Sequence, residues 1–319
     1  MAARLGGRSA RAGAWALGGA AVLGAALAAS ALPGRQTPDP GPAPAGPGPA
    51  ADCPAPTRTV TDAPGLQRAL DGAAAGETIG LADGVYRGRF VVSAGGTAAS
   101  PVHVCGSRRA VLDGGSLDAG YVLHVRRAAH VRLVGFTVRR GAKGVVLDGA
   151  RHVQLRGLTV ERTGEEGVHL RAFSSDNLLV GSTVQATGLR RPQLGEGVYV
   201  GSAHANWCAL TGCRPDTSDR NVIRDNRITG TTAEPVDVKE GSTGGEVVGN
   251  VFDGATLVGA YADSWVDVKG NGWAVRGNRG RVSRGDGFQT HQVLPGWGRR
   301  NEFRGNTAQV DGPGFGFRL

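Results

Sequence analysis

Aromatic residues are scarce in this sequence, at 5% of 319 residues, and methionine occurs only once. A compact helical or doubly wound domain of this length needs more large side chains for its core, so those folds are disfavoured. Beyond the N-terminal region no apolar run could span a membrane. The net charge of +9 is spread along the chain, which argues against a nucleic-acid-binding protein. Glycine is abundant instead, with 54 residues, and predicts many turns.

The N-terminal region has the pattern of a secretory signal. Arg4, Arg8 and Arg11 precede an apolar run that ends in small residues near Ala29 to Ala31. We therefore expect a signal peptide over residues 1–32 and an exported protein, although the run is also long enough for an uncleaved anchor at the cell surface. Residues 33–57 are almost entirely Pro, Ala, Gly and Asp, which predicts a linker before a folded domain over residues 58–319.

The four cysteines are even in number and belong to an exported chain, which favours disulfides over metal ligation. The stretch "WCALTGC" suggests a bond between Cys208 and Cys213, which leaves Cys53 to pair with Cys105. Three pairings are possible from sequence alone. A zinc site would need further His or Cys ligands at suitable spacing, and the sequence does not offer them.

Imperfect repeats of about 22 to 30 residues follow one another after residue 100. Three of them read "GVVLDGARHVQLRGLTVERTG", "PVDVKEGSTGGEVVGNVFDGA" and "WVDVKGNGWAVRGNRGRVSR". Each repeat contains short apolar-polar alternations between turns, which is the periodicity of strands. A strand that cannot cover its own apolar face is stabilised by stacking on an equivalent neighbour. The repeats therefore predict an all-β, right-handed parallel β-helix.

One position in each repeat is occupied by a residue suited to a tight turn. Gly and Asn tolerate a left-handed backbone, and stacked Asn amides can hydrogen-bond from coil to coil. In this alignment the position holds Gly135, Gly157, Gly181, Asn226, Asn250, Asn278 and Asn306. Before the repeats, residues from about Pro64 to Ala74 predict a short helix that caps the open end of the β-helix.

The first strand of each repeat alternates inward valines with outward side chains, so the alignment predicts three surface columns. The first column contains His169, Tyr199, Asp237, Asp267 and Gln289. The second contains Arg171, Gly201, Lys239, Lys269, His291 and Arg318. The third, just before each strand, contains Glu166, Glu196, Glu234, Ser264 and Asp286. One face of the β-helix thus carries acids beside bases.

These charges have two interpretations. They can be solvated residues that pair diagonally between coils, as on many exposed sheets. Alternatively, carboxylates gathered on one face can bind Ca²⁺ or transfer protons, with Asp237, Asp267 and Asp286 as candidate ligands. Trp207, Trp265 and Trp273 either stack on sugar rings or pack within the structure. The segment "GSAHANWCALTGCRPDTSD" interrupts a repeat and predicts one wall of a groove.

Over residues 58–319 the sequence resembles the pectin-lyase-like superfamily. The stretch "GETIGLADGVYRGRFVVSAGGTAASPVHVCG" is similar to the N-terminal region of the chondroitinase B and alginate lyase group. "EPVDVKEGSTGGEVVGNVFDG" is similar to that group's glutamate followed by a strand ending in lysine. The resemblance implies that Lys239 is the base that removes the C5 proton of a uronate, with Glu234 as the neighbouring acid. The arginine that partners this lysine in the group has no clear counterpart, and Lys269 stands at that register.

Three functions remain open at this stage. The first is a polysaccharide lyase acting on an acidic, uronate-containing polysaccharide by β-elimination, with the pKa of Lys239 lowered by Lys269. The substrate carboxylate would be neutralised either by Ca²⁺ as a cofactor or by Arg and Lys side chains without one, and the chain is expected to act as a monomer. Substrate contacts are expected from Arg171, His169, Tyr199, His291 and Glu196. The second is a non-catalytic glycan-binding protein of the cell surface, and the third is a glycoside hydrolase that uses two carboxylates of the same face.

Overall fold

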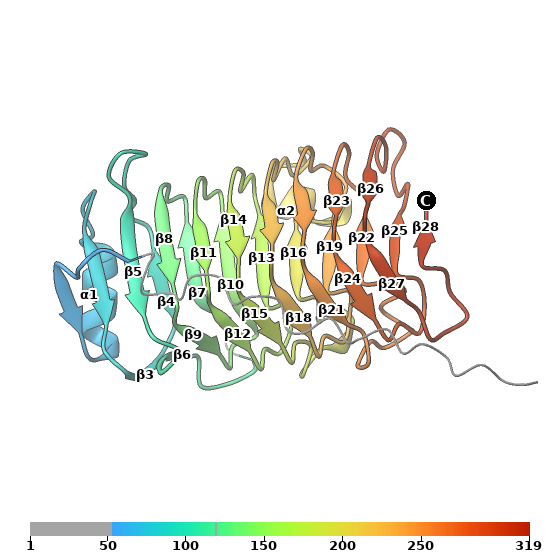
Figure 1. Ribbon diagram of the computed structural model, residues 1–319. Helices are drawn as coiled ribbons and strands as arrows, with labels where there is room; N and C mark the ends of the chain where they lie inside the picture. Colours follow the sequence, from blue (N-terminus) through green and yellow to red (C-terminus); the bar gives the residue numbers. More distant parts are fainter. Residues whose placement is uncertain (1–52, 119) are drawn as a thin grey trace, which may run out of the picture. The chain divides into compact units, whose positions relative to one another are not determined.

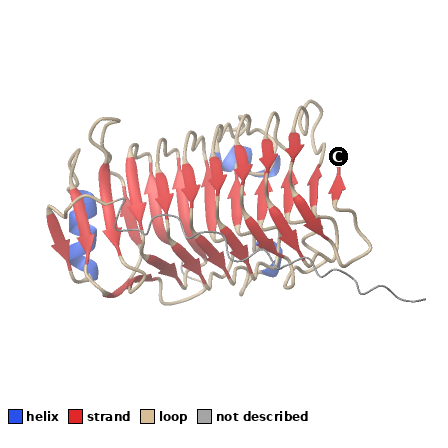
Figure 2. Ribbon diagram, viewed as in Figure 1, coloured by secondary structure: helices blue, strands red, loops and turns tan. Residues whose placement is uncertain are grey.

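A computed structural model describes residues 53–118 and 120–319 of the chain. These residues form one compact unit in which the chain winds through three parallel sheets, one strand per sheet in each full coil. Figure 1 shows the coils stacked in chain order, and Figure 2 shows that helices contribute little. The predicted right-handed parallel β-helix is confirmed. The predicted signal peptide and nearly all of the predicted linker lie outside the described residues.

Three sheets run the length of the β-helix. Sheet 1 consists of β1 (Arg58–Val60), β2 (Thr78–Leu81), β5 (Val102–Gly106), β8 (Val131–Val134), β11 (Gln154–Arg156), β14 (Leu178–Val180), β17 (Val222–Arg224), β20 (Glu246–Val248), β23 (Ala274–Arg276) and β26 (Glu302–Arg304). Sheet 2 consists of β3 (Gly84–Arg87), β6 (Ala110–Asp113), β9 (Thr137–Arg139), β12 (Thr159–Glu161), β15 (Thr183–Gln185), β18 (Arg227–Thr229), β21 (Val251–Asp253), β24 (Arg279–Arg281) and β27 (Thr307–Gln309). Sheet 3 consists of β4 (Phe90–Val92), β7 (Tyr121–Arg126), β10 (Lys143–Asp148), β13 (Val168–Arg171), β16 (Val198–Val200), β19 (Val236–Val238), β22 (Val266–Val268), β25 (Phe288–Thr290) and β28 (Phe317–Arg318).

The core is built by equivalent residues stacked coil on coil. In β19 and β22, Val236 pairs with Val266 and Val238 with Val268, and all four side chains are fully buried. Such burial contributes roughly 1.5–3 kcal/mol per side chain. The repeated valines of the sequence therefore line the interior, which places the residue between each pair on the outer face of sheet 3.

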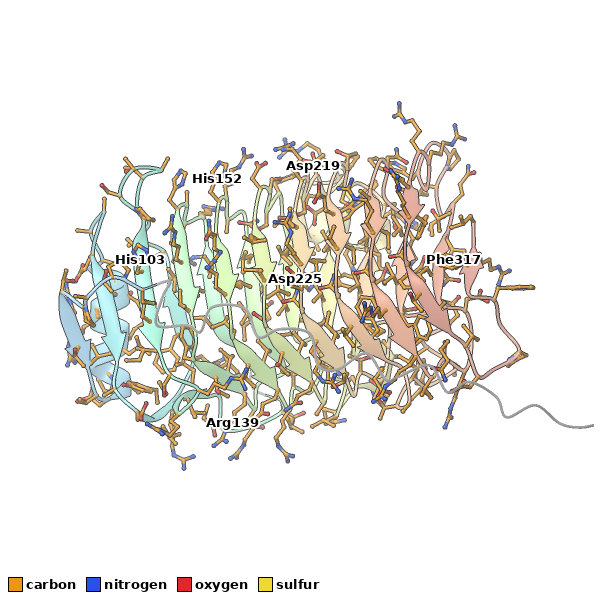
Figure 3. The ribbon with its side chains drawn as sticks, viewed as in Figure 1. His103, Arg139, His152, Asp219, Asp225 and Phe317 are labelled. Atoms are coloured by element: carbon orange, nitrogen blue, oxygen red, sulfur yellow. A yellow bond between two sulfur atoms is a disulfide. The ribbon has the colours of Figure 1, made fainter. Side chains whose placement is uncertain are left out.

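The turn that follows sheet 1 differs from the sequence alignment by one residue. Gly249 and Gly277 have left-handed φ angles of 67° and 62°, and Asn250 and Asn278 come directly after them. Asp225, labelled in Figure 3, takes the same left-handed position with φ of 54°. The prediction that Gly and Asn share one column is therefore wrong, because they occupy adjacent columns with different tasks.

The buried asparagines form the predicted coil-to-coil ladder. The Asn250 amide nitrogen Nδ2 donates to Oδ1 of Asn278 over 2.9 Å, and the same oxygen accepts from the backbone N–H of Asn250 over 2.9 Å. Asn226 and Asn306 continue this pattern at either end. Each rung satisfies a backbone donor that would otherwise be buried without a partner.

The N-terminal coil is covered by helix α1 (Ala63–Asp71), which Figure 1 shows beside the first strands. Asp62 caps the helix by accepting a hydrogen bond from the Gly65 N–H over 2.6 Å. Leu66 and Leu70 are buried and pack into the core. The predicted capping helix is thus present, although it ends at Asp71 instead of Ala74.

Both predicted disulfides are present: Cys53 is bonded to Cys105 and Cys208 to Cys213. Within the described residues, no helix is long and apolar enough to cross a membrane. Of the three candidate sugar-stacking tryptophans, Trp265 and Trp273 are fully buried and belong to the core. Only Trp207 remains partly accessible.

Candidate functional site

The outer face of sheet 3 carries the charged columns, and all three lysines of the chain lie on this sheet or directly after one of its strands. The strand register pairs Tyr199 with Asp237 and Asp237 with Asp267, as the alignment predicted. Arg318 is an exception. It pairs with Gln289 and so belongs to the first column, not to the second column that was predicted for it.

Asp237 is the centre of an ion-pair network that joins two coils. Its carboxylate lies 2.6 Å from Nζ of Lys239 and 2.8 Å from Nζ of Lys269. Lys269 also lies 2.5 Å from the carboxylate of Asp267, which in turn contacts Nδ1 of His291 at 3.1 Å. The contact between Lys269 and Asp237 runs diagonally from one coil to the next. Asp237 and Asp267 are each 2% exposed. Charges this deeply buried are stabilised by one another and cannot be treated as solvated surface residues.

The pKa of Lys239 is raised above its usual value. Burial alone would lower this pKa, but the Asp237 carboxylate outweighs burial, with Glu196 and Glu234 adding to its effect. Lys269 behaves in the same way. The expectation that the pKa of Lys239 is lowered is therefore wrong, because the Asp237 carboxylate contacts both ammonium groups and favours the charged form of both.

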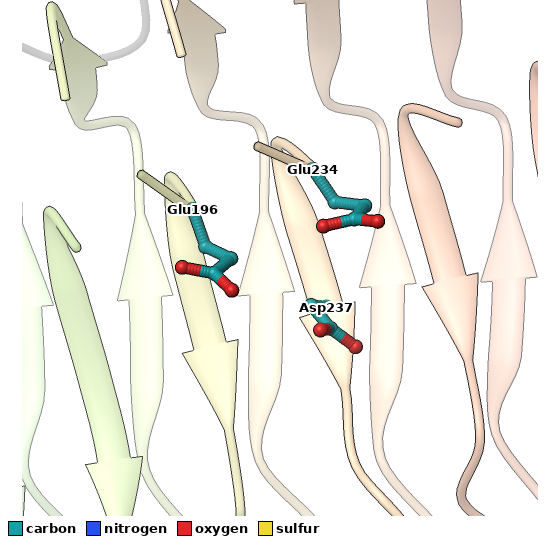
Figure 4. Close-up of side chains that lie close together, drawn as sticks. All are labelled: Glu196, Glu234 and Asp237. Carbon is teal, nitrogen blue, oxygen red and sulfur yellow. The ribbon is translucent and has the colours of Figure 1, made fainter. Parts of the chain in front are cut away.

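Figure 4 shows two glutamates, Glu196 and Glu234, beside Asp237. Within residues 53–118 and 120–319, neither glutamate forms an ion pair with a lysine. Glu196 and Glu234 are 6% and 7% exposed, and each has one carboxylate oxygen within 4.8 Å of the other and of an Asp237 oxygen. Burial, reinforced by Asp237, raises the pKa of Glu234 to about 8. Burial next to Glu166 and Asp237 also raises the pKa of Glu196 well above its usual value. One oxygen of Glu196, Oε2, is buried and has no hydrogen-bond partner in the part of the chain that the structure describes.

The site therefore contains more acids than cations can neutralise. A second acidic group is formed by Glu234 with Asp263 and Asp267. Asp263 escaped the sequence analysis because it lies in the irregular segment before β22, one residue ahead of Ser264 in the third column. Asp286 lies apart from both groups, where it accepts a hydrogen bond from the Phe315 N–H over 2.7 Å.

Two of the expected substrate contacts lie in the floor of the site. His169 is 4% exposed, and its Nε2 lies 2.9 Å from the carbonyl oxygen of Gly201. Arg171 is 8% exposed and donates to Asp148 over 2.7 Å and to the Tyr121 hydroxyl over 2.7 Å. Nε2 of His169 and the Arg171 guanidinium are already paired, and both side chains are buried, so the two residues offer little to a ligand.

Tyr199 lies next to the lysine of its neighbouring coil. Nζ of Lys239 is 5.1 Å from the centroid of the Tyr199 ring, and the His169 ring packs edge-on against the other side at 4.5 Å. Burial, Asp237 and Glu196 together raise the pKa of Tyr199 well above its usual value. The hydroxyl thus keeps its proton under all ordinary conditions. The Tyr199 hydroxyl, a proton donor, and the Lys239 amine therefore lie close together on adjacent coils.

Replacing Glu234 by glutamine is expected to change how stability depends on pH. Because the folded-state pKa of Glu234 is about 8, wild-type stability is complete below the unfolded pKa of about 4.3 and falls as pH rises towards 8. Glutamine stays neutral, so at pH 8.5 in chelator the variant should melt about 3 °C or more above wild type, with little difference at pH 4. Thermal unfolding measures this. Glu246→Gln, on sheet 1, is the control, and an equal difference at both pH values would contradict the assignment.

A segment between β16 and β17 forms one edge of the site. It contains the 3₁₀ turn η3 (His204–Asn206), the short α-helix α2 (Trp207–Leu210) and the disulfide between Cys208 and Cys213. Glu240, in the coil of Lys239, accepts a hydrogen bond from the His204 N–H over 2.7 Å. This segment is the predicted insertion, and it is fixed next to the coil that carries the lysine.

Fold and site together define a right-handed parallel β-helix with a buried cluster of ionisable side chains on the outer face of one sheet. The alginate lyase from Paenibacillus sp. str. FPU-7 superimposes on this chain with a TM-score of 0.74 and 37% sequence identity, covering 82% of this chain and 95% of the lyase. This chain belongs to the same family as that lyase, which confirms the resemblance to the β-helix lyases.

A more distant structure shares the fold. Pectate lyase Pel9A has a TM-score of 0.54 and 14% identity, and the match covers 82% of this chain and 78% of the lyase. At this identity the likeness shows the architecture alone. No protein-family model and no curated protein sequence matches the chain.

Proposed function

We propose that this protein is an exported polysaccharide lyase that cleaves a uronate-containing polymer by β-elimination. The observation that carries the proposal is the 37% identity to an alginate lyase over 95% of that enzyme, combined with the Lys239 and Tyr199 pair on the open face. The two disulfides support an oxidising compartment outside the cytosol.

Lys239 is the proposed base. In β-elimination the base removes the proton on C5 of a uronate, the C4–O bond breaks, and a double bond forms between C4 and C5. Nζ of Lys239 must first lose its own proton, and its raised pKa predicts a reaction that accelerates towards alkaline pH. Tyr199 is the proposed acid, because its raised pKa keeps a proton available for the departing oxygen.

The negative charge that develops on the substrate carboxylate must be neutralised. Lys269 is the proposed protein group for this task, since it is a buried cation one coil away from Lys239. His291 supports it, because its hydrogen bond to Asp267 raises the pKa of the imidazole and favours its cationic form. Glu234 stays near the reacting centre as the neighbouring acid.

A divalent cation such as Ca²⁺ fits the remaining carboxylates. Glu196 has a buried oxygen without a hydrogen-bond partner among the described residues and lies in one group with Glu234 and Asp237, and oxygen donors are what Ca²⁺ prefers. We assign the cation to Glu196, Glu234 and Asp237. When bound, it supplies positive charge that neutralises a sugar carboxylate and lowers the pKa of nearby ammonium groups.

Calcium binding should therefore release protons and stabilise the fold. Burial raises the pKa of Glu234 to about 8 and also raises the pKa of Glu196, so adding CaCl₂ to a weakly buffered sample at pH 7 is expected to acidify it and to raise the melting temperature. The Glu196→Gln, Glu234→Gln double variant should show neither effect. Equal acidification by wild type and the double variant would place the cation elsewhere.

The function itself is tested by incubating the full chain with alginate, pectate and chondroitin, with and without chelator. A lyase produces unsaturated sugars that absorb in the ultraviolet. Reducing ends without such absorbance would identify a glycoside hydrolase. Binding without any product would identify a glycan-binding protein.

A further inference from the structure

A hollow lies on the side of the β-helix that carries Lys239, but several coils closer to the N-terminus. Its volume is about 500 Å³. It is lined by Arg126, Arg127, Asp148, Gly149, Arg151, Ala172, Phe173, Ala209 and Leu210. The last two residues come from α2, so the disulfide-linked segment between β16 and β17 covers this hollow from one side.

The hollow is strongly cationic. Arg126, Arg127 and Arg151 are exposed, and none of them forms an ion pair with any residue in 53–118 or 120–319. The one acid in the lining, Asp148, is already bound by Arg171 at 2.7 Å and by Nε2 of His124 at 2.8 Å. Three arginines are therefore free to bind an anion, while the acid that could compete for them is neutralised from below.

The strand register aligns this hollow with the proposed catalytic lysine. Arg126 pairs with Asp148, and Asp148 with Arg171, which continues the second column to Gly201 and Lys239. Strands in a sheet are about 4.8 Å apart, so the four steps from β19 to β7 span about 19 Å. This corresponds to a few sugar residues of an extended polysaccharide. Gly201, which lies between Arg171 and Lys239 in this column, adds no side chain to it.

The wall of the hollow is held in place by buried contacts. Asp216 is fully buried and accepts hydrogen bonds from the N–H groups of Ala172 and Phe173, both over 2.9 Å. It also accepts from the Ser202 hydroxyl over 2.7 Å, which ties the start of the segment to its end. Arg214 lies over the Phe173 ring, 4.7 Å from its centroid. A site formed before the ligand arrives loses less entropy on binding.

We propose that this arginine hollow is a distal subsite, which binds a carboxylate of the same polysaccharide a few sugars away from the bond cleaved at Lys239. The inference rests on the proposed function and adds a length requirement to it. A short oligosaccharide at Lys239 cannot reach the hollow, whereas a long one binds both places at once. The chain is therefore selective for long, acidic polymers.

Binding of alginate oligosaccharides tests the subsite. The parent protein is the full chain with Lys239→Ala, which prevents turnover, and calorimetry measures its affinity for a trisaccharide and an octasaccharide. Adding R126A, R127A and R151A is expected to weaken octasaccharide binding at least about tenfold and to leave trisaccharide binding unchanged. The charge-matched control is R87A with R227A and R279A, three exposed arginines of sheet 2, which should change neither affinity.

Each other outcome has a defined meaning. If the parent binds both oligosaccharides and the R126A, R127A, R151A variant binds them equally well, the distal subsite is excluded while the proposed function stands. If both affinities fall to the same extent, the arginines act as a general attraction and the subsite is again excluded. If the parent binds neither oligosaccharide although the wild type cleaves alginate, the distal subsite is excluded while the proposed function stands. If the wild type cleaves no polyuronate, the proposed function fails as well.

Discussion

Lys239→Ala is expected to lower kcat on the cleaved polyuronate by about a hundredfold or more, since loss of a general base typically costs 10²–10⁴ in rate. Lys239→Arg should be equally inactive, although it keeps the positive charge beside Asp237, because a guanidinium does not give up its proton. Ultraviolet absorbance of the unsaturated product measures both rates.

The matched control for this prediction is Lys143→Ala. Lys143 is also a buried lysine of sheet 3, but it pairs with Glu165 and Glu166, three coils away from β19. Its replacement should leave kcat within a few-fold of wild type. Full activity in Lys239→Ala would remove Lys239 from the mechanism and move the search for the base to Tyr199, Lys269 and His291.

Asp237→Asn is expected to destabilise the fold by roughly 3–5 kcal/mol, the usual cost of removing one partner from a buried ion pair. The variant leaves Lys239 and Lys269 facing each other with no shared counter-ion, and both are largely buried. Chemical denaturation at pH 7 measures the loss. Asp176→Asn, which breaks a partly exposed pair with Arg220, should cost about 1 kcal/mol or less.

The loss in Asp237→Asn should depend on pH in a defined direction. Burial raises the pKa of Asp237, but Lys239 and Lys269 outweigh it, so the folded-state pKa is below the usual value. A lowered carboxyl pKa gives stability that is present above the unfolded value of about 3.9 and is lost as pH falls. The difference between wild type and variant should therefore shrink below pH 4. A difference that persists unchanged at low pH would contradict the ion-pair account.

The fold could be predicted from the sequence because the β-helix repeats one simple rule. Alternating valines, such as Val236 and Val238, fix which side chains face inwards, and the outward columns follow from strand geometry. The disulfides could be predicted because four cysteines allow only three pairings and two of the cysteines lie five residues apart. The position of the turn asparagines could not be predicted, because a shift of one residue within a turn hardly changes the alignment of the strands on either side.

The electrostatics of the site could be predicted only in part. The sequence places Lys239 near Lys269, but it does not show that the Asp237 carboxylate lies between them and reverses the direction of the pKa shift. Asp263 was missed because it belongs to no periodic position. The arginine hollow was missed because Arg126 lies in an early coil and Ala209 in an insertion, so only folding brings them together.

Mass spectrometry of the oligosaccharides released by the wild-type chain tests the central claim most directly. β-Elimination adds no water, so the new non-reducing ends should be unsaturated and lighter by one water molecule than those made by hydrolysis. We predict unsaturated ends from the wild type and none from Lys239→Ala. Saturated ends from the wild type, or unsaturated ends at the same rate from the variant, would contradict it.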